Sequence, residues 1–434
     1  MALRFFGLFL VMPLIALGAM SLEGATPFLA GCTVGGYAFM QMIFQYPFGA
    51  LSDRLGRKKM IAIGMVIFAA GSVVCAISDS VWLLIVGRFI QGAGAVSSVI
   101  TATIGDLVIE ENRSKAMALM GASIALSFII ALPVGLIVGG TLGISTLFWG
   151  SAALTLPALV ILKWGVPNPP RIIPLEAIAG SKLKHAFSDR NLARLNIAMF
   201  LHSFVMTSVF LFIPIVLTRE HGFAIGELWK VYLPALACGI SAMAIGTMIG
   251  EKKNAVKAVM LAGIALLIAV FLSLALMPQM IIWWIMLIFV GINSLEPLMQ
   301  SSATKFARAD ERGSALGVFN ACQFCGIFVG GMCAGFIYGD YGLPALAIVL
   351  CALCMIWFAL TLNMANPVKT QLLAIAPKET NLRKEQIESI SGVHECYMLE
   401  GEKIYIRFNP RAISNEKLRS RLLDYAAIRT DHAN

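Results

Sequence analysis

The sequence predicts an all-α membrane protein of twelve transmembrane helices in two six-helix repeats, followed by a small α+β domain. The composition gives the first reason: 59% of the 434 residues are hydrophobic and 13% are charged, whereas soluble proteins carry about 25% charged residues. The second is a series of twelve apolar stretches, each close to the roughly 20 residues that cross a bilayer. The third is a change in composition after residue 366, where charged residues become about three times as frequent.

Each apolar stretch is predicted to be one spanning helix, because a helix satisfies its own backbone groups in lipid. The stretches are 4–22, 28–51, 60–77, 82–107, 114–138, 146–166, 194–218, 227–250, 255–277, 281–304, 313–338 and 343–366. Between the sixth and the seventh, residues 167–193 contain four prolines and several basic residues, which is typical of a linker. The predicted domains are therefore an N-terminal half at 1–166, this cytoplasmic linker, a C-terminal half at 194–366, and a soluble domain at 367–434.

Basic residues indicate which side of the membrane each loop faces. The loops after the second, fourth, sixth, eighth and tenth stretches carry most of the Lys and Arg, and the opposite loops carry little beyond Arg219 and Lys230. Because basic loops stay in the cytoplasm, we expect both termini there, in a multi-pass protein of the cell membrane, the inner membrane of a bacterium. This placement explains most of the net charge of +9, and we expect no nucleic-acid partner.

Two loop motifs recur at a nearly constant offset. Asp53-Arg54 recurs as Glu251-Lys252, 198 positions later, and Glu111-Asn112-Arg113 recurs as Asp310-Glu311-Arg312, 199 positions later. The recurrence indicates duplication of a six-helix unit. Parallel repeats of this kind place a substrate site between the halves, near the membrane midplane.

The longest local pattern follows the second stretch and reads Gly49-Ala-Leu-Ser-Asp53-Arg54-Leu-Gly56-Arg57-Lys58-Lys59. Gly49 is expected to let two helices approach closely, and Gly56 suits a tight turn. Neither glycine is needed for membrane orientation. The motif is therefore expected to have a role beyond that of a basic loop.

That expected role is a conformational latch. Asp53 is an anion that suits the positive N-terminus of the eleventh helix, near Gly313, and Arg57 is placed to pair with Asp53 or Asp106. Such a latch would favour one of two access states, the outward-facing one; the alternative is a solvated loop that serves orientation only. The latch residues are Gly49, Asp53, Arg54, Gly56, Arg57 and Asp106.

Three ionisable residues inside predicted spans are candidates for proton coupling. Arg88 lies in the fourth stretch, where an unpaired charge costs at least about 2.5–3.5 kcal/mol, so it faces a cavity or has a structural partner. Glu296 is the acidic residue deep in the C-terminal half. Removal from water disfavours its charged form, so it is expected to take up protons, unless it is permanently paired or neutral. His202 is expected to be a second proton site, or to be merely hydrogen-bonded.

Four polar residues of the predicted spans are expected to line a substrate cavity: Tyr37, Gln41, Gln45 and Asn293. For the first three, helix packing is an equal alternative. We expect no cofactor beyond a proton gradient and no metal, because the CxxC spacings at 322–325 and 351–354 lie in apolar helices, where Cys behaves as a small hydrophobe. No nucleophile–base set is found, so no catalytic residues and no enzyme activity are predicted.

The loop motif resembles the signature G-x-L-(A/S)-D-R-x-G-R-(K/R) of the major facilitator superfamily at every fixed position. Arg88-Phe-Ile-Gln91-Gly92 resembles the R-x-x-Q-G pattern of the same family. The antiporter signature G-P-x-x-G-G is only partly matched, since Leu132 replaces the glycine before Pro133. Longer runs are similar to the YajR-like branch: Phe5 to Asp106, Asn112 to Met117, Leu201-His202, Trp229 to Tyr232, and Gly313 to Gly331.

The resemblance implies a secondary active transporter that works by alternating access, with proton-coupled efflux (antiport) of a small amphipathic or drug-like molecule. It implies that Asp53, Arg57, Asp106, Glu296 and His202 are its working parts. The expected partners are the lipid bilayer, a small-molecule substrate and protons, and the chain is expected to be a monomer. The alternatives are a proton-independent facilitator, an uptake symporter, or a transporter-like sensor that signals through its C-terminal domain.

The YajR-like branch also carries a ferredoxin-like cytoplasmic domain after the twelfth helix. The composition of 367–434 fits such a module. Residues 382–391 and 414–425 are predicted to be helices, and 394–399 and 403–408 to be paired strands. Related modules bind metal through a CxxC loop, but this segment has only Cys396, so no metal is expected there.

Overall fold

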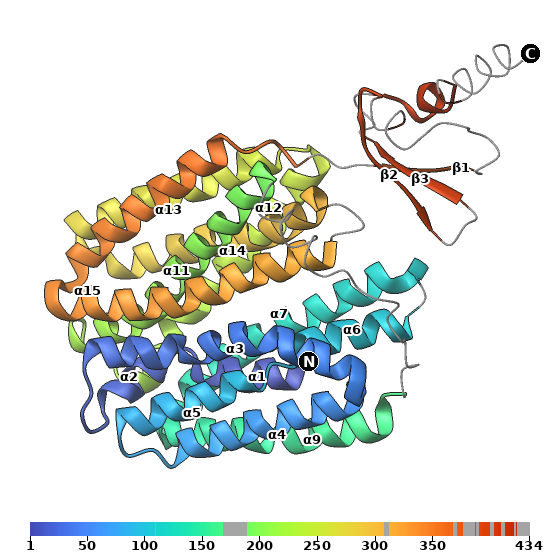
Figure 1. The fold of residues 1–434 in the computed structure, drawn as a ribbon. Coiled ribbons are helices and arrows are strands. Elements are labelled where there is room, and N and C mark those ends of the chain that lie inside the picture. Colours follow the sequence, from blue (N-terminus) through green and yellow to red (C-terminus); the bar gives the residue numbers. More distant parts are fainter. Residues whose placement is uncertain are drawn as a thin grey trace, which may run out of the picture.

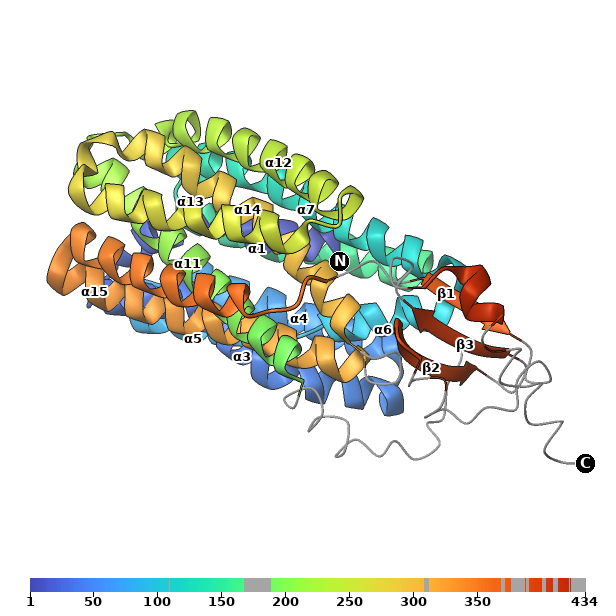
Figure 2. The ribbon, with the colours of Figure 1, turned by 90° about the horizontal axis from the view of Figure 1, so that it is seen from above.

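Two bundles of long helices lie side by side, and a small sheet lies beyond one end of them (Figures 1 and 2). The structure, a computed structural model, describes residues 1–108, 110–167, 189–307 and 312–367, and in the C-terminal part 371–375, 387, 390–399, 403–408, 413–420 and 422. Most of the predicted linker therefore lies outside the described residues. Within them, ten helical segments are long and apolar enough to cross a membrane, judged by length and composition.

The first bundle contains ten described elements. They are α1 (Ala2–Val11), α2 (Ile15–Met20), α3 (Pro27–Leu55), α4 (Arg57–Ala76), α5 (Val81–Ala93), α6 (Ser97–Leu107), α7 (Glu110–Leu142), α8 (Ile144–Ala153), α9 (Thr155–Val160) and the π-helical segment η1 (Ile161–Gly165). The first, fourth and sixth predicted stretches are thus each divided. The division of the fourth, between α5 and α6, exposes a helix N-terminus inside the bundle.

The second bundle contains seven described elements. They are α11 (Arg190–Arg219), the 3₁₀ turn η2 (Ile225–Glu227), α12 (Trp229–Lys252), α13 (Val256–Leu276), the 3₁₀ turn η3 (Pro278–Met280), α14 (Ile281–Phe306) and α15 (Arg312–Leu362). Gly342 interrupts α15 with a φ of 77°, a region that glycine adopts without steric strain. The interruption lies between the predicted eleventh and twelfth stretches, and the chain turns back there (Figure 1).

The two bundles meet closely at one end, where glycines remove the side chains between backbones. A Cβ atom on Gly31 would lie 2.0 Å from the carbonyl oxygen of Gly331, and one on Gly335 would lie 2.2 Å from that of Pro27. These contacts join α3 to α15, and Gly140 of α7 similarly meets the turn η2. We call this end, which carries the loops 21–26, 77–80 and 220–224, the far end.

The opposite end carries most of the basic residues and is called the basic end. Loop contacts hold each bundle together there. The Nζ of Lys58 donates to the carbonyl of Val166 at 2.7 Å, and the side-chain amide of Asn366 donates to the carbonyl of Asn254 at 2.7 Å. The N-terminus of α3 lies at the far end and its C-terminus at the basic end, which sets the direction of every later helix.

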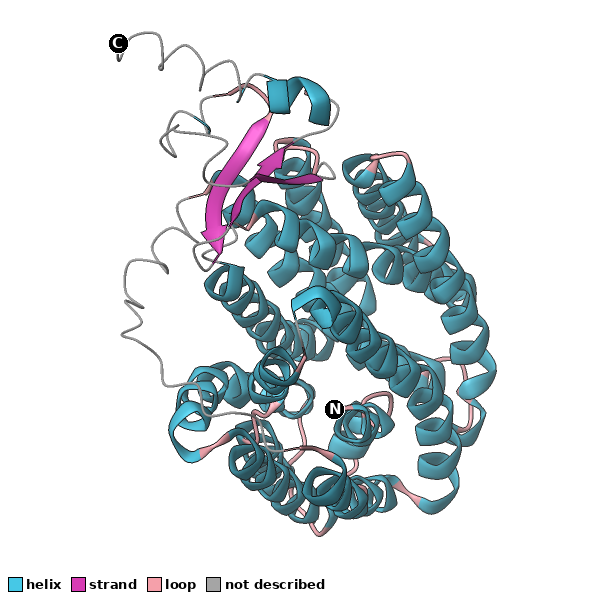
Figure 3. Cartoon of the chain, turned by 90° about the vertical axis from the view of Figure 1, so that its right-hand side faces the viewer, coloured by secondary structure: helices cyan, strands magenta, loops and turns pink. Residues whose placement is uncertain are grey.

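The small C-terminal domain contains a three-stranded antiparallel sheet. Its strands are β1 (Gln371–Ile375), β2 (Val393–Leu399) and β3 (Lys403–Phe408), in the order β1-β3-β2. The two predicted strands and their pairing are confirmed, whereas β1 was not predicted. Figure 3 shows the sheet with a short helix against it, and residues 415–420 of the predicted helix 414–425 are helical.

Alternation along β3 places its apolar side chains on one face. Ile406 and Phe408 are fully buried, and they pack with Cys396 and Leu418 in a core separate from that of the helices. Cys396 therefore belongs to this core. The predicted helix 382–391 lies almost entirely outside the described residues, so the ferredoxin-like topology remains a prediction.

Candidate functional site

The turn between α3 and α4 gathers two carboxylates around one guanidinium. Gly56 has a φ of 97°, a conformation that favours glycine, and it starts α4 at Arg57. Arg57 then reaches back to α3 and across to α6. Its Nη1 lies 2.6 Å from Oδ1 of Asp53, and its Nε donates to Oδ2 of Asp106 at 2.8 Å. Arg57 pairs with both carboxylates, where the sequence predicted one or the other.

The Asp53 carboxylate remains accessible in this arrangement. Its side chain is 38% exposed, against 13% for Asp106. Among the described residues its bonding partner is Arg57. The start of α15, where the latch contact is predicted, adjoins residues outside the described ones, and the latch role stays a prediction.

The other two latch residues are less involved than predicted. The expectation that Gly49 permits a close helix approach is wrong for this structure. A Cβ there would meet its nearest neighbour, Oγ of Ser98, at 3.7 Å, which is ordinary van der Waals contact. Arg54 is exposed on the last turn of α3.

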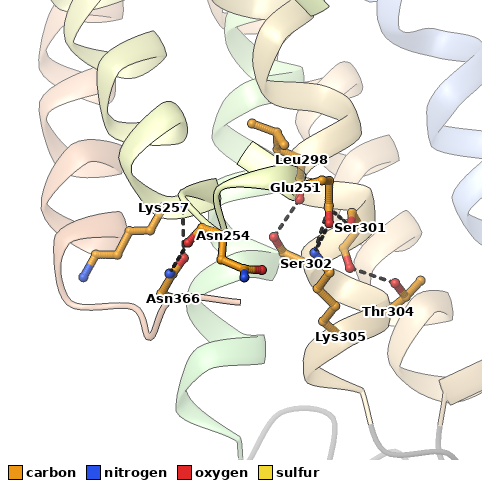
Figure 4. Close-up of polar contacts among 9 residues, drawn as sticks. All are labelled: Glu251, Asn254, Lys257, Leu298, Ser301, Ser302, Thr304, Lys305 and Asn366. Atoms are coloured by element: carbon orange, nitrogen blue, oxygen red, sulfur yellow. Dashed lines mark hydrogen bonds and ion pairs between the residues drawn. The ribbon is translucent and has the colours of Figure 1, made fainter. Parts of the chain in front are cut away.

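The second bundle carries an ion pair at the corresponding place (Figure 4). Nζ of Lys305, at the end of α14, donates to Oε1 and Oε2 of Glu251 at 2.7 and 2.8 Å. Ser301 donates a further hydrogen bond of 2.7 Å to the same carboxylate. The recurrence of Asp53 as Glu251 in the sequence thus corresponds to a charged tie at the same end of both bundles.

Arg88 is buried and fully occupied by contacts within its own bundle. Its Nε donates to the carbonyl of Thr33 at 3.1 Å and its Nη1 to the side chain of Gln91 at 2.6 Å. The guanidinium also lies over the ring of Tyr37, 4.6 Å from its centroid. These contacts match the structural alternative, and no acidic side chain contributes to them among the described residues.

A second buried arginine, Arg4 of α1, was missed by the sequence reasoning. It is 5% exposed. Its Nη2 donates to Oε1 of Gln41 at 2.7 Å, and its Nη1 donates to Oγ of Ser97 at 3.0 Å. The signal for it was a charged residue at the start of the first apolar stretch, where arginine ordinarily marks an orientation loop.

Glu296 and His202 lie near one another in the second bundle. Nε2 of His202 is 3.2 Å from the carbonyl oxygen of Ile292, one turn before Glu296 on α14, and the Glu296 charge acts on the imidazole. Glu296 is half-buried. Within the described part of the chain, its carboxylate has no hydrogen-bond or ion-pair partner. The permanently paired alternative is therefore not what this structure contains.

The His202 ring has one free nitrogen. Hydrogen bonding to a carbonyl requires Nε2–H, which in the neutral ring leaves Nδ1 as an acceptor. Among the described residues Nδ1 is buried without a partner, and the ring packs edge-on against Trp357 at 5.7 Å between centroids. The ring is therefore held in place while one nitrogen remains able to accept a proton.

The residues predicted to line a cavity separate into two groups. Gln41 bonds to Arg4, Ser97 and, at 3.4 Å, Gln45, so these polar groups form one network in the first bundle. Tyr37 packs beneath Arg88. In the second bundle Asn293 donates to the carbonyl of its own helix at Phe289 and packs on Gly239 of α12, so its amide takes part in helix packing.

No group of three or more metal-ligating side chains occurs among the residues with described positions. The ionisable groups that the structure does bring together are pairs and networks inside each bundle. Basic groups occupy the interior of the first bundle, and an acidic group with a histidine occupies that of the second. This arrangement suits proton exchange and charged-ligand binding.

Comparison with known proteins identifies the family. The sequence model of the Major Facilitator Superfamily matches residues 1–295 and 255–391. The inner membrane transport protein YajR of Escherichia coli (strain K12) is 32% identical over 428 residues, 94% of this chain and 93% of that protein.

The fold agrees with the sequence match. A crystal structure of a mutant of the nucleoside transporter NupG has a TM-score of 0.66 at 15% identity over 83% of this chain and 97% of that one. The human organic anion transporter MFSD10 has a TM-score of 0.61 at 18% identity, over 83% and 96% of the two chains. The sequence matches show that this chain belongs to the major facilitator superfamily, in the YajR-like branch of its transporters, and the fold agrees.

Proposed function

We propose that this protein is a proton-coupled efflux transporter, in which Glu296 is the group that binds and releases the coupling proton. The observation that carries the proposal is the carboxylate of Glu296, which has no hydrogen-bond or ion-pair partner among the described residues and lies half-buried on a membrane helix beside His202. An ionisable residue inside a membrane span is costly to keep unless it serves a function. A carboxylate without a fixed partner is free to change its protonation state at each step of a cycle.

The proposed topology has twelve spans with both termini in the cytoplasm of a bacterial cell. The ten long helices support it if α1 with α2 forms one span and Gly342 divides α15 into two. The basic end is then cytoplasmic. The chain is proposed to act as a monomer in the inner membrane, where the E. coli relative is named.

In the proposed cycle the halves rock about a substrate site between them. Close contacts at the far end between Gly31 and Gly331 support a resting state that opens toward the cytoplasm. Protonation would neutralise Glu296 and favour one orientation; release would favour the other. The cluster of Asp53, Arg57 and Asp106 would stabilise the outward-facing state when Asp53 meets the positive N-terminus of α15.

The test is Glu296→Gln in the full chain, reconstituted in liposomes that contain a pH-sensitive dye. Ethidium, a cation, and 4-aminohippurate, a carboxylate, are added outside in separate experiments under an imposed pH gradient, and both solute accumulation and proton movement are recorded. The expected result is a loss of coupled proton movement of about tenfold or more, because an amide does not titrate. The matched control Glu227→Gln alters an exposed carboxylate at η2 and should transport as the unmodified protein does.

Two outcomes would contradict the proposal. Uphill transport by Glu296→Gln at the unmodified rate would remove Glu296 from the coupling step. Flux of either solute through the unmodified protein that ignores the pH gradient would support the facilitator alternative instead.

A further inference from the structure

The break between α5 and α6 places a helix N-terminus beside a buried arginine. Backbone N–H groups of Ala95 and Val96 bond to carbonyls only two residues earlier, so the helix stops and restarts. The restart is packed tightly. A Cβ on Gly94 would lie 2.4 Å from the carbonyl oxygen of Gly64, and one on Gly92 would lie 2.0 Å from that of Tyr37. The break is thus a fixed part of the bundle.

The first turn of α6 has no side-chain cap. Its N-cap residue is Val96, which has no side-chain acceptor, and the carbonyl of Val96 accepts from the N–H of Ile100, which begins the backbone bonding of the helix. The early N–H groups of a helix point outward along its axis and carry a partial positive charge. Such an end attracts an anion.

The arginine adds a full positive charge at the same place. Nη1 of Arg4 donates to Oγ of Ser97, the first residue of α6. The other partners of Arg4 are the neutral side chain of Gln41 and the rings of Phe5 and Phe68. In the described part of the chain no carboxylate neutralises it, and its Nε is buried without a partner.

Two positive features therefore face each other without a counter-ion among the described residues. A buried guanidinium ordinarily pairs with a carboxylate or phosphate in bidentate geometry. Gln41 and Gln45 supply further amide groups beside the guanidinium, and Ser97 and Gln45 are partly exposed. The chemistry of these groups suits a small, negatively charged ligand.

We propose that Arg4, Ser97 and Gln41, with the N-terminus of α6, form a binding site for the carboxylate group of an organic anion, which is the transported molecule. This inference deepens the proposed function. It rests on that function only for the statement that the bound anion is transported. The binding site itself does not depend on proton coupling. Broken helices that aim an N-terminus at an anionic group are a recognised device of membrane transporters.

The binding test uses the full chain in detergent and a matched pair of probes, 4-phenylbutyrate and its uncharged amide, 4-phenylbutanamide. Equilibrium dialysis should show the acid binding about tenfold or more tightly than the amide, the effect of one charge-assisted pair. Arg4→Gln should weaken binding of the acid about tenfold or more. The control Arg219→Gln changes an exposed arginine at the end of α11 and should leave it unaltered.

A second variant keeps the test decisive if Arg4→Gln fails to fold. Ser97→Asp builds a carboxylate into the site, so it should raise the melting temperature by about 2 °C or more and abolish binding of 4-phenylbutyrate. Ser97→Asn should do neither. If neither probe binds the unmodified protein, the melting temperature of Ser97→Asp tests the site: a rise supports it, and a fall contradicts it.

Equal affinity for acid and amide, unchanged binding in Arg4→Gln, or a lowered melting temperature in Ser97→Asp would overturn the site. Failure here is separable from failure of the proposed function. Selective binding of the acid with pH-insensitive flux would leave the site standing and remove proton coupling. Proton-coupled flux without any preference for the acid would do the reverse.

Discussion

At the basic end, each bundle has an ion pair that joins corresponding helices within that bundle, but the charged residues differ. In the first, Arg57 bridges the carboxylates of Asp53 and Asp106. In the second, Lys305 pairs directly with Glu251. Lys305 stands 199 positions after Asp106, so the repeat has replaced an acid with a base at one equivalent place.

Among the described residues, one guanidinium in the first cluster pairs with two carboxylates. Val256 stands 199 positions after Arg57 and is buried, so an apolar residue takes the place of the bridging cation, and Lys305 supplies the positive charge that pairs with Glu251. The extra carboxylate of the first bundle, Asp53, is the exposed one. We therefore expect Asp53 to exchange partners during a cycle, whereas Glu251, which binds both Lys305 and Ser301, is expected to serve as a fixed tie.

The largest expected effect comes from removing the bridging cation. Arg57→Gln leaves two carboxylates beside each other, and both lose their counter-ion. We expect transport to fall about tenfold or more and the melting temperature to drop, because an unpaired, partly buried charge is strongly unfavourable. Transport in liposomes and thermal unfolding measure this, with Lys59→Gln, an exposed cation two residues along, as the control. Activity equal to that control would show that the bridge has no role.

A smaller effect is expected in the second bundle. Glu251→Gln removes a charge from a fixed tie, so the melting temperature should fall by a few degrees while transport falls less than about threefold. The exchanged pair, Glu251→Lys with Lys305→Glu, should restore the melting temperature, since a neutral pair tolerates reversal. A double variant as unstable as the single one would contradict the fixed-tie interpretation.

The sequence predicted the helices well because their signal is collective. Long apolar stretches and basic loops are each defined by many residues, so one exceptional residue does not hide them. The loop motif also predicted that Arg57 pairs with Asp53 or Asp106. Single residues failed where their role depends on a distant neighbour. Arg4 was missed because its partners Gln41 and Ser97 are far away in sequence, and β1 was missed because a strand of five residues is recognised through its pairing with β3.

Asp53→Asn should separate conformational balance from stability. The carboxylate is more than a third exposed in this state, so its loss should change the melting temperature by less than about 1 °C. It should nevertheless shift the population of the outward-facing state about twofold to threefold, because the latch would lose its charge. Single-molecule fluorescence distances across the basic end measure the shift, and Asp79→Asn, a carboxylate at the far end, is the control. An unchanged population would end the latch hypothesis.

The smallest effect is expected at the exposed pair of Glu227 and Lys230. Nζ of Lys230 lies 2.6 Å from Oε1 of Glu227, and about half of each side chain is exposed to solvent. Because water competes for both charged groups, Lys230→Gln should change the melting temperature by less than about 1 °C at neutral pH. A larger change in melting temperature would mean that this exposed pair stabilises the protein as much as the ion pairs at the basic end do.

The interiors of the two bundles differ as their ends do, with Arg4 and Arg88 buried in the first and Glu296 half-buried in the second. The central claim is that Glu296 changes its protonation state. Infrared difference spectroscopy of the reconstituted protein, between about pH 6 and about pH 9 near the range where transport proteins operate, detects protonated carboxyl groups directly. If Glu296 is the group that changes, a carboxyl band is expected in the unmodified protein and in Glu227→Gln, and it should be missing in Glu296→Gln. A band of equal intensity in all three proteins would contradict it.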